Sequence, residues 1–172
     1  MSYERLEDTF KDLIKVTNQA GSGIYRTNKH LPNVFYVDRP HSVLGNPFSM
    51  TDESQRMEVL NKYADYFNDI VSHNIKGQPY PEEQLLPSTL EAMNNLNTAY
   101  WINKRGGVKV TGQSFMDALR NIISQTKKNQ FDSIELADWC APRPCHAETI
   151  GNYIGQYADK IFKNKRWFKW QY

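Results

Sequence analysis

The stretch LADWCAPRPCHAETI, residues 136–150, decides the fold because it joins a predicted buried strand to a predicted helix. The segment FDSIELADW, residues 131–139, is a candidate for a buried strand. From about Ala147 onward, apolar residues recur at the three-and-four spacing of a helix packed on a core. The loop of residues 138–148, here called the Cys-rich loop, therefore follows the carboxyl end of a strand.

A second strand, loop and helix follow the same order earlier in the chain. VFYVD at 34–38 predicts a buried strand, and an amphipathic helix is predicted from near Ser49 or Thr51 to Val71. The segment RPHSVLGNPF between them, residues 39–48, is here called the GNP loop. In an open parallel sheet, ligands bind beyond the carboxyl ends of the strands. We therefore expect a ligand pocket between the GNP loop and the Cys-rich loop.

The remaining predicted elements are mostly helical. Apolar spacing predicts helices over residues 3–17 and 113–128, and another from Ser88 through an inward-facing Tyr100 to KRGG at 104–107. IYRT at 24–27 is a weaker strand candidate, and VKV at 108–110 fits either a strand or a connector. This alternation predicts an α/β fold with a small, mostly parallel sheet flanked by helices.

Size and charge exclude several classes of protein. The chain has 172 residues and a formal charge of +2, which predicts a single globular domain over 1–172 without a general affinity for nucleic acid. It contains no apolar run near the roughly 20 residues that span a bilayer, and its first residues do not resemble a signal peptide. Its two cysteines do not form a secreted disulfide framework. We expect a cytoplasmic protein with no membrane partner.

The GNP loop suits an anionic ligand. Gly45 permits a close approach to the backbone, Asn46 offers hydrogen bonds to a sugar or base, and Pro47 fixes the exit from the turn. Arg39 would clamp a phosphate, and the start of the next helix would offer unpaired N–H groups. The alternative is that Gly-Asn-Pro is only a tight turn.

The Cys-rich loop has three interpretations. Asp138, Cys140, Cys145 and His146 are all residue types that bind zinc, although their spacing is not a standard zinc pattern. Cys145 would instead be a nucleophile if the helix dipole lowered its thiol pKa. In the third interpretation the prolines stiffen the loop, Trp139 and Cys140 pack inward, and His146 and Glu148 face a ligand. On this third interpretation the protein needs no metal or other cofactor.

Together, RPHSVLGNPF and DWCAPRPCHAE resemble the paired motifs of a domain-of-unknown-function family common in phage and bacterial genomes. Members of that family carry R-P-x4-G-N-P-F followed by C-x-P-x-x-C-H. This chain departs from the pattern at Asp138, where the family usually has a cysteine. The family looks related to the Rossmann-like group of nucleoside deoxyribosyltransferases and nucleotide-sensing domains.

The resemblance implies a Rossmann-like core over residues 24–162 that binds a nucleotide or nucleotide sugar. Residues 1–22 would be a helical addition, and about 75–130 a helical insertion. If the protein is an enzyme, we expect N-glycosidic chemistry, with Glu148 stabilising an oxocarbenium-like centre and His146 protonating the leaving base. The predicted ligand contacts are Arg39, Gly45, Asn46, Pro47, Trp139 and Cys145.

Two other functions stay open at this point. The first is a non-catalytic phage protein that sequesters a nucleotide signal or a host factor. The second is a nucleic-acid module that uses the tail KNKRWFKWQY, residues 163–172, whose basic residues alternate with aromatic ones. The sequence leaves the oligomeric state undecided.

Overall fold

The computed structural model describes residues 3–19 and 31–162, which fall into two compact units. One unit, here the helical unit, comprises Met1–Tyr3 and Val37–Leu119; the other, here the sheet unit, comprises Glu4–Tyr36 and Arg120–Tyr172. The strand candidate at 24–27 and the basic-aromatic tail at 163–172 lie outside the described residues. Each unit has its own core and is described by itself.

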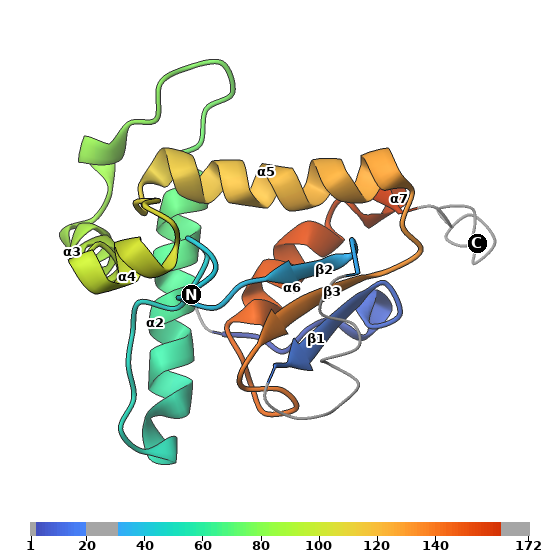
Figure 1. Ribbon diagram of the computed structural model, residues 1–172, viewed down its shortest axis with the longest axis horizontal. Helices are drawn as coiled ribbons and strands as arrows, with labels where there is room; N and C mark the ends of the chain where they lie inside the picture. The colour runs from blue at the N-terminus through green and yellow to red at the C-terminus, as the bar shows by residue number, and fades with distance from the viewer. Residues whose placement is uncertain (1–2, 20–30, 163–172) are drawn as a thin grey trace. The chain divides into compact units, whose positions relative to one another are not determined.

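The sheet unit is built on three parallel strands in the order β1-β3-β2 (Figure 1). The strands are β1 (Ile14–Asn18), β2 (Val34–Tyr36) and β3 (Ile134–Asp138). The side chains of the central strand β3 are almost entirely buried, and its neighbours pair with both of its edges. The predicted α/β class with a small parallel sheet is therefore confirmed.

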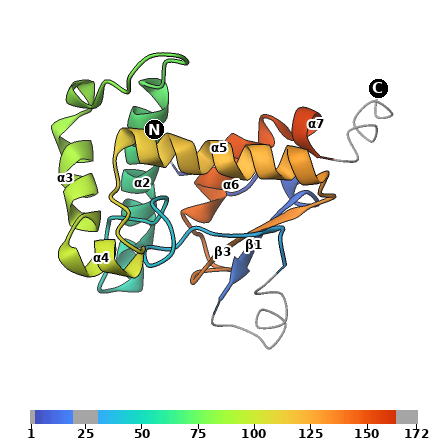
Figure 2. The same ribbon diagram turned by 45° about the horizontal axis from the view of Figure 1, so that its top comes forward.

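Helices complete the sheet unit. The helix α6 (Ala147–Gly155) packs against β1 and β3 on one face of the sheet, as Figures 1 and 2 both show. Gly151 allows this close packing, because a Cβ atom there would lie 2.9 Å from Leu6 Cδ1 and 3.3 Å from Ile14 Cγ2. The short helix α7 (Ala158–Ile161) and the second part of α5 (Gly112–Asn129) belong to the same unit.

The predicted helix over residues 3–17 is wrong. The structure has a short 3-10 helix, η1 (Asp8–Phe10), followed by β1. The spacing of Leu13, Ile14 and Thr17 fits a helical face, but Ile14 and Lys15 also alternate between buried and exposed, as in a strand. Pairing with β3, from Ile14 opposite Ile134 to Asn18 opposite Asp138, decided between the two. Tertiary pairing commonly overrides such local patterns.

The helical unit centres on α2 (Arg56–Ser72), which lies beside α3 (Pro87–Leu96) in Figure 2. It also contains η2 (Glu53–Gln55), η3 (Glu82–Gln84), α4 (Ala99–Lys104) and the first part of α5. Its core is aromatic: Phe115 of α5 meets Tyr66 and Phe67 of α2 with ring centroids 5.8 and 5.5 Å apart. Aromatic pairs at these distances and steep angles are favourable.

Two predicted features of the helical unit need correction. The helix after the GNP loop begins at Arg56, later than Ser49 or Thr51, because the residues just before it form the 3-10 helix η2. Tyr100, predicted to face inward, is 60% exposed.

Of the two alternatives for residues 108–110, the structure shows the connector and not the strand. None of the helices in residues 3–19 and 31–162 is long and apolar enough to cross a membrane.

Candidate functional site

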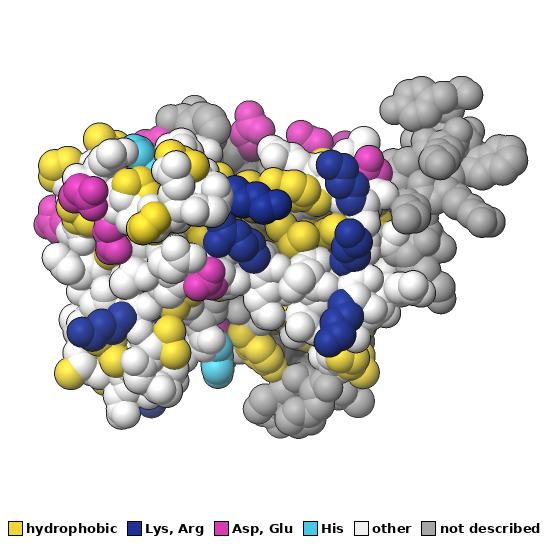
Figure 3. Space-filling model, turned by 90° about the horizontal axis from the view of Figure 1, so that it is seen from above, with side chains coloured by type: hydrophobic (Ala, Val, Ile, Leu, Met, Phe, Trp, Pro, Cys, Tyr) yellow, Lys and Arg dark blue, Asp and Glu magenta, His cyan; other side chains and the backbone are white. Residues whose placement is uncertain are grey.

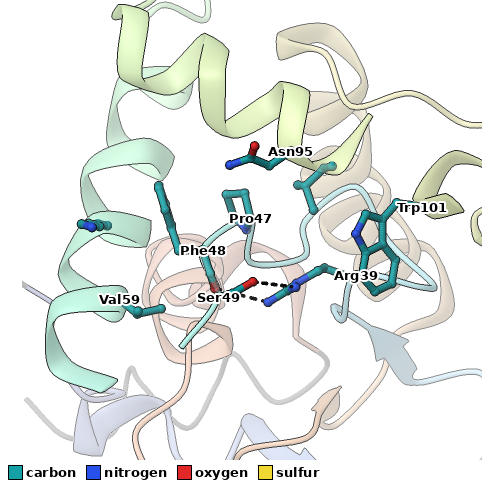
Figure 4. A pocket seen from close by; sticks show the side chains of 9 residues that line it. Arg39, Pro47, Phe48, Ser49, Val59, Asn95 and Trp101 are labelled. Carbon is teal, nitrogen blue, oxygen red and sulfur yellow. Dashed lines mark hydrogen bonds between the residues drawn. The ribbon is translucent and has the colours of Figure 1, made fainter. Parts of the chain in front are cut away.

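The GNP loop borders a cavity of about 290 Å³ in the helical unit (Figure 4). Its lining is drawn from several elements: the loop itself, α2, α3 and α4. The lining side chains include Arg39, Phe48, Lys62, Asn95 and Trp101. Two cationic groups, two aromatic rings and an amide therefore converge on one small space.

Arg39 is held at the cavity by its neighbours. Its guanidinium donates hydrogen bonds to Ser49 Oγ at 3.3 Å and to the Phe48 carbonyl at 3.2 Å. The same group lies 5.6 Å from the centre of the Trp101 ring, within the range of a cation–π contact, and Figure 4 shows the two side chains beside each other. The cationic head of Arg39 is thus fixed next to an aromatic face before any ligand arrives.

Arg105 does not line the cavity but forms hydrogen bonds to residues that do. This buried side chain donates hydrogen bonds to three main-chain carbonyls, those of Arg39, Leu96 and Val108. Burial lowers the pKa of Arg105, and the nearby Tyr66 hydroxyl opposes that shift. Since Arg39 and Leu96 both line the cavity, Arg105 ties two sides of it together.

Gly45 and Asn46 shape the turn that leads into the cavity. A Cβ atom on Gly45 would lie 2.6 Å from Arg39 Cα, so only glycine lets the loop fold back on itself here. The Asn46 side chain accepts a hydrogen bond from Phe48 N at 2.9 Å, which is a local turn contact. Of the four ligand contacts predicted in this loop, Arg39 and Pro47 line the cavity.

In the sheet unit, Asp138, Cys140, Cys145 and His146 form a compact group, here called the Cys-His cluster. One ligand atom from each of Asp138, Cys140 and Cys145 lies within 4.8 Å of the other two. Asp138 Oδ2 accepts a hydrogen bond from Cys145 Sγ at 2.8 Å and lies 3.1 Å from His146 Nδ1. The sequence placed these four side chains in one loop, and the structure brings Asp138 close to each of the other three.

Contacts within the Cys-His cluster set its charge states. Burial acts to raise the pKa of Asp138, but the charge and hydrogen bond of His146, with the Cys145 thiol, outweigh it and lower the pKa to about 2. The pKa of Cys145 is raised by its contact with Cys140, by burial and by Asp138. This direction is opposite to the one predicted from the helix dipole. It disfavours Cys145 as a thiolate nucleophile, because the thiol is also fully buried.

Three hydrogen bonds tie the Glu148 carboxylate into the fold. Its Oε2 accepts hydrogen bonds from Arg5 Nε at 2.9 Å and Leu6 N at 2.8 Å. Its Oε1 accepts one from Cys145 N at 3.2 Å, which caps the start of α6. These bonds join the N-terminal segment to the Cys-rich loop. The catalytic roles of Glu148 and His146 stay predictions.

Two side chains of the Cys-rich loop are less buried than predicted. Trp139, expected to pack inward, is 48% exposed, and Cys140 is half-buried. The prediction that Trp139 packs inward is wrong, because this residue lies one position beyond the end of β3 at Asp138, and the burial of the strand does not extend to it.

Sequence reasoning missed most of the cavity lining. Lys62, Asn95 and Trp101 lie on helices whose sequences carry no motif, and the fold alone brings them to the GNP loop. The one available signal was the adjacent aromatic pair Tyr100 and Trp101, whose rings meet 4.8 Å apart on a short helix. Neighbouring exposed aromatic side chains can mark a contact surface.

The distribution of basic side chains on the described surface bears on the nucleic-acid alternative. On the face shown in Figure 3, lysine and arginine side chains stand singly or in small groups among neutral and acidic ones. A nucleic-acid module usually gathers its basic residues into one patch or stripe. The tail on which that alternative depends lies outside the described residues.

Comparison with known proteins gives one match. No curated protein matches the chain, and no solved structure matches it. One family does match, over residues 24–156, which include the GNP loop, the cavity lining and the Cys-His cluster. This span covers well over half of the sequence, so the chain belongs to the family described as Domain of unknown function (DUF4326).

Proposed function

We propose that the helical unit binds a mononucleotide-type ligand, a phosphate joined to a sugar and a heteroaromatic ring. The observation that carries this proposal is the convergence of Arg39, Lys62 and Trp101 on one cavity of about 290 Å³. Ligand pockets commonly range from about 300 to 1,000 Å³, so this cavity suits one nucleotide better than a dinucleotide.

The phosphate would take the place of weak contacts that Arg39 now makes. The hydrogen bonds from the Arg39 guanidinium to Ser49 Oγ and the Phe48 carbonyl are 3.2–3.3 Å long. Charge-assisted hydrogen bonds to a phosphate are shorter and stronger. Lys62, which now forms an exposed ion pair with Glu58 at 3.3 Å, would supply a second positive charge. Exposed ion pairs contribute little, so redirecting Lys62 costs little.

The ring of the ligand would meet the aromatic lining. Trp101 and Phe48 offer flat apolar faces, and stacking on such faces is tolerant of the identity of the base. The Asn95 amide carries both donors and an acceptor and would contact a base edge or a ribose hydroxyl. The segment RPHSVLGNPF resembles a motif of a domain-of-unknown-function family, and the resemblance of that family to nucleotide-binding Rossmann-like domains supports the same ligand class.

Binding is better supported than N-glycosidic chemistry. A carboxylate that acts as a nucleophile or stabilises a cation needs an oxygen directed at the substrate. Glu148 instead accepts three hydrogen bonds from the protein itself. The proposal therefore describes a binding protein, and turnover that is lost in Glu148→Gln with unchanged folding would extend it to an enzyme.

The test is calorimetric titration of the full chain with the four ribonucleoside 5′-monophosphates and with inorganic phosphate. We expect at least one nucleotide to bind more tightly than phosphate alone. Arg39→Ala should weaken binding roughly tenfold or more, because hydrogen bonds to charged groups are worth about 1.5–3 kcal/mol. Arg39→Lys should recover only part of this, since lysine lacks the planar fork of arginine.

Two matched variants make the result specific. Lys76→Ala removes an exposed cation of the same unit that does not line the cavity, and should leave the affinity unchanged. Trp101→Leu should weaken nucleotide binding but leave phosphate binding unaffected. The proposal is overturned if no nucleotide binds, or if Lys76→Ala and Arg39→Ala weaken binding equally.

A further inference from the structure

We propose that the Cys-His cluster of the sheet unit is a zinc site, with Cys140 Sγ, Cys145 Sγ, an Asp138 carboxylate oxygen and His146 Nδ1 as the four ligands. This site is separate from the proposed nucleotide pocket and uses none of its residues. Its role would be structural, holding the Cys-rich loop to the start of α6.

The ligand atoms of Asp138, Cys145 and His146 are already near the spacing that zinc requires, and the Cys140 thiol must move toward His146 to complete the site. Zinc bonds of about 2.0–2.3 Å place tetrahedral ligand atoms roughly 3.3–3.8 Å apart. Here the separations are 2.8 Å for Cys145 Sγ to Asp138 Oδ2, 3.1 Å for His146 Nδ1 to Asp138 Oδ2, and 3.9 Å for Cys145 Sγ to His146 Nδ1. Cys140 Sγ lies within 4.8 Å of the Asp138 and Cys145 ligand atoms.

The backbone that carries these ligands is already fixed. Asp138 ends β3, where its carbonyl accepts a hydrogen bond from Gln19 N at 2.7 Å. Asn18 Nδ2 donates to the Ala141 carbonyl at 2.9 Å, and Arg143 N donates to the Cys140 carbonyl at 3.0 Å. Cys145 N donates a hydrogen bond to Glu148 Oε1, which fixes the far end of the loop. Ligands on a braced loop lose little conformational entropy when the metal binds.

The type of ligand selects zinc among the common metals. Two thiols and an imidazole are soft or borderline ligands, whereas Mg²⁺ and Ca²⁺ prefer oxygen atoms. Asp138, Cys145 and His146 are all buried, with exposed fractions of 5% or less, which is typical of a closed structural site. On binding, each thiol loses its proton to solvent, and the resulting thiolate forms a bond to the ion.

A disulfide is the main competing outcome for the same two cysteines. The two thiols are close, and oxidation would join them with loss of two electrons and two protons to an added oxidant. A disulfide would leave no thiolate for a metal. The experiment must therefore begin with protein purified under reducing conditions and without a chelator.

The first measurement is the metal content of the wild-type full chain, followed by removal of metal with a chelator and titration with Zn²⁺ and Co²⁺. We expect about one zinc per chain, two thiols protected from an aromatic disulfide reagent, and their release to reaction after chelation. Co²⁺ should give the thiolate charge-transfer and tetrahedral absorption bands. Wild-type protein that takes up neither ion, with both thiols reactive throughout or already in a disulfide, overturns the proposal.

Variants then assign the ligands. Cys145→Ser, Asp138→Asn and His146→Gln should each weaken zinc binding at least tenfold, because even groups that only support ligands cost about 10–100-fold when mutated. Asp132→Asn, an exposed acid of the same unit, and His73→Gln, a histidine of the helical unit, are the controls and should retain wild-type affinity.

The Co²⁺ spectrum separates a lost ligand from a misfolded chain. A variant that folds, as judged by circular dichroism, and loses the thiolate bands confirms its ligand. Unchanged zinc affinity in folded Cys145→Ser or Asp138→Asn overturns the site, and unchanged affinity in His146→Gln overturns the assignment of the fourth ligand. Nucleotide affinity plays no part in these readouts, so failure of the proposed function would not affect them.

Discussion

The guanidinium of Arg105 donates a hydrogen bond from Nη1 to the main-chain carbonyl of Arg39, 3.3 Å away. A buried cation thus positions the residue that is proposed to bind phosphate, without lining the cavity itself. The relationship makes cavity geometry and folding stability depend on the same side chain.

Arg105→Met should therefore lower both stability and nucleotide affinity. It removes hydrogen bonds to three carbonyls, and leaving buried carbonyls unpaired costs about 1–3 kcal/mol each before relaxation. We expect a loss of about 2–4 kcal/mol in urea unfolding, with Lys76→Met as the exposed control. A variant with wild-type stability and weakened affinity would show that Arg105 acts on the ligand directly.

Tyr66 and Tyr63 should respond to loss of their hydroxyl groups in opposite ways. Both are buried on α2, but Tyr63 Oη donates to the Leu44 carbonyl at 2.7 Å, whereas Tyr66 Oη has no hydrogen-bond partner among the described residues. Tyr63→Phe should destabilise the protein by about 1–3 kcal/mol, and Tyr66→Phe should leave it unchanged or stabilise it by about 1 kcal/mol. Thermal or urea unfolding of the two variants checks this, and equal losses would contradict it.

Gly155→Ala should destabilise the sheet unit although alanine favours helices. A Cβ atom there would lie 2.3–2.6 Å from three atoms of the Phe10 ring. The helix-propensity gain of up to about 1 kcal/mol is smaller than the overpacking cost of about 1–3 kcal/mol. A double-mutant cycle with Phe10→Ala tests the cause, because the clash should vanish in that background. Equal effects in both backgrounds would place the cost elsewhere.

Glu148→Ala should cost more stability than Arg5→Ala. The Glu148 carboxylate is buried and also accepts bonds from Leu6 N and Cys145 N, whereas Arg5 is 57% exposed. We expect about 2–3 kcal/mol for Glu148→Ala from the main-chain donors left unpaired. The partly exposed ion pair limits Arg5→Ala to about 1 kcal/mol. Urea unfolding measures both, and an equal cost would mean that the ion pair dominates.

Tyr153 should make the sheet unit lose stability in alkali. Burial and the contact with Tyr157 raise the pKa of Tyr153 to about 12. The folded chain thus favours the neutral form of Tyr153. The contribution of this group to the free energy of unfolding is fully present below the ordinary tyrosine pKa near 10, and it is lost as pH rises from about 10 to 12. Tyr153→Phe should flatten the pH dependence in this window. An unchanged slope would assign the loss to other tyrosines.

Local sequence patterns predicted the elements that are buried on several sides. The segment before Asp138 was predicted as a strand and forms β3, and the helical spacing through Phe115, Leu119 and Ile122 predicted α5. The same reasoning failed for β1, because five residues satisfy a helical and a strand pattern equally well and the choice depends on a partner far along the chain.

The two candidate sites also differ in how far the sequence predicted them. The Cys-His cluster was predictable, because its members are close in sequence and a single loop brings them together. The cavity was only half predictable: Arg39 and Pro47 lie in a motif, whereas Asn95 and Trp101 reach the cavity only through the packing of α3 and α4. Such long-range placement leaves no local signature.

The strand order β1-β3-β2 has a consequence for the way the polypeptide is made. Both β1 and β2 precede β3 along the chain, and both pair with it, with Ile14 of β1 opposite Ile134. The segment Val37–Leu119 lies between β2 and β3 and is therefore synthesised before β3, and domains generally fold as units during synthesis. The helical unit can thus begin to fold on the nascent chain, whereas the three-stranded sheet cannot form until β3 has been made.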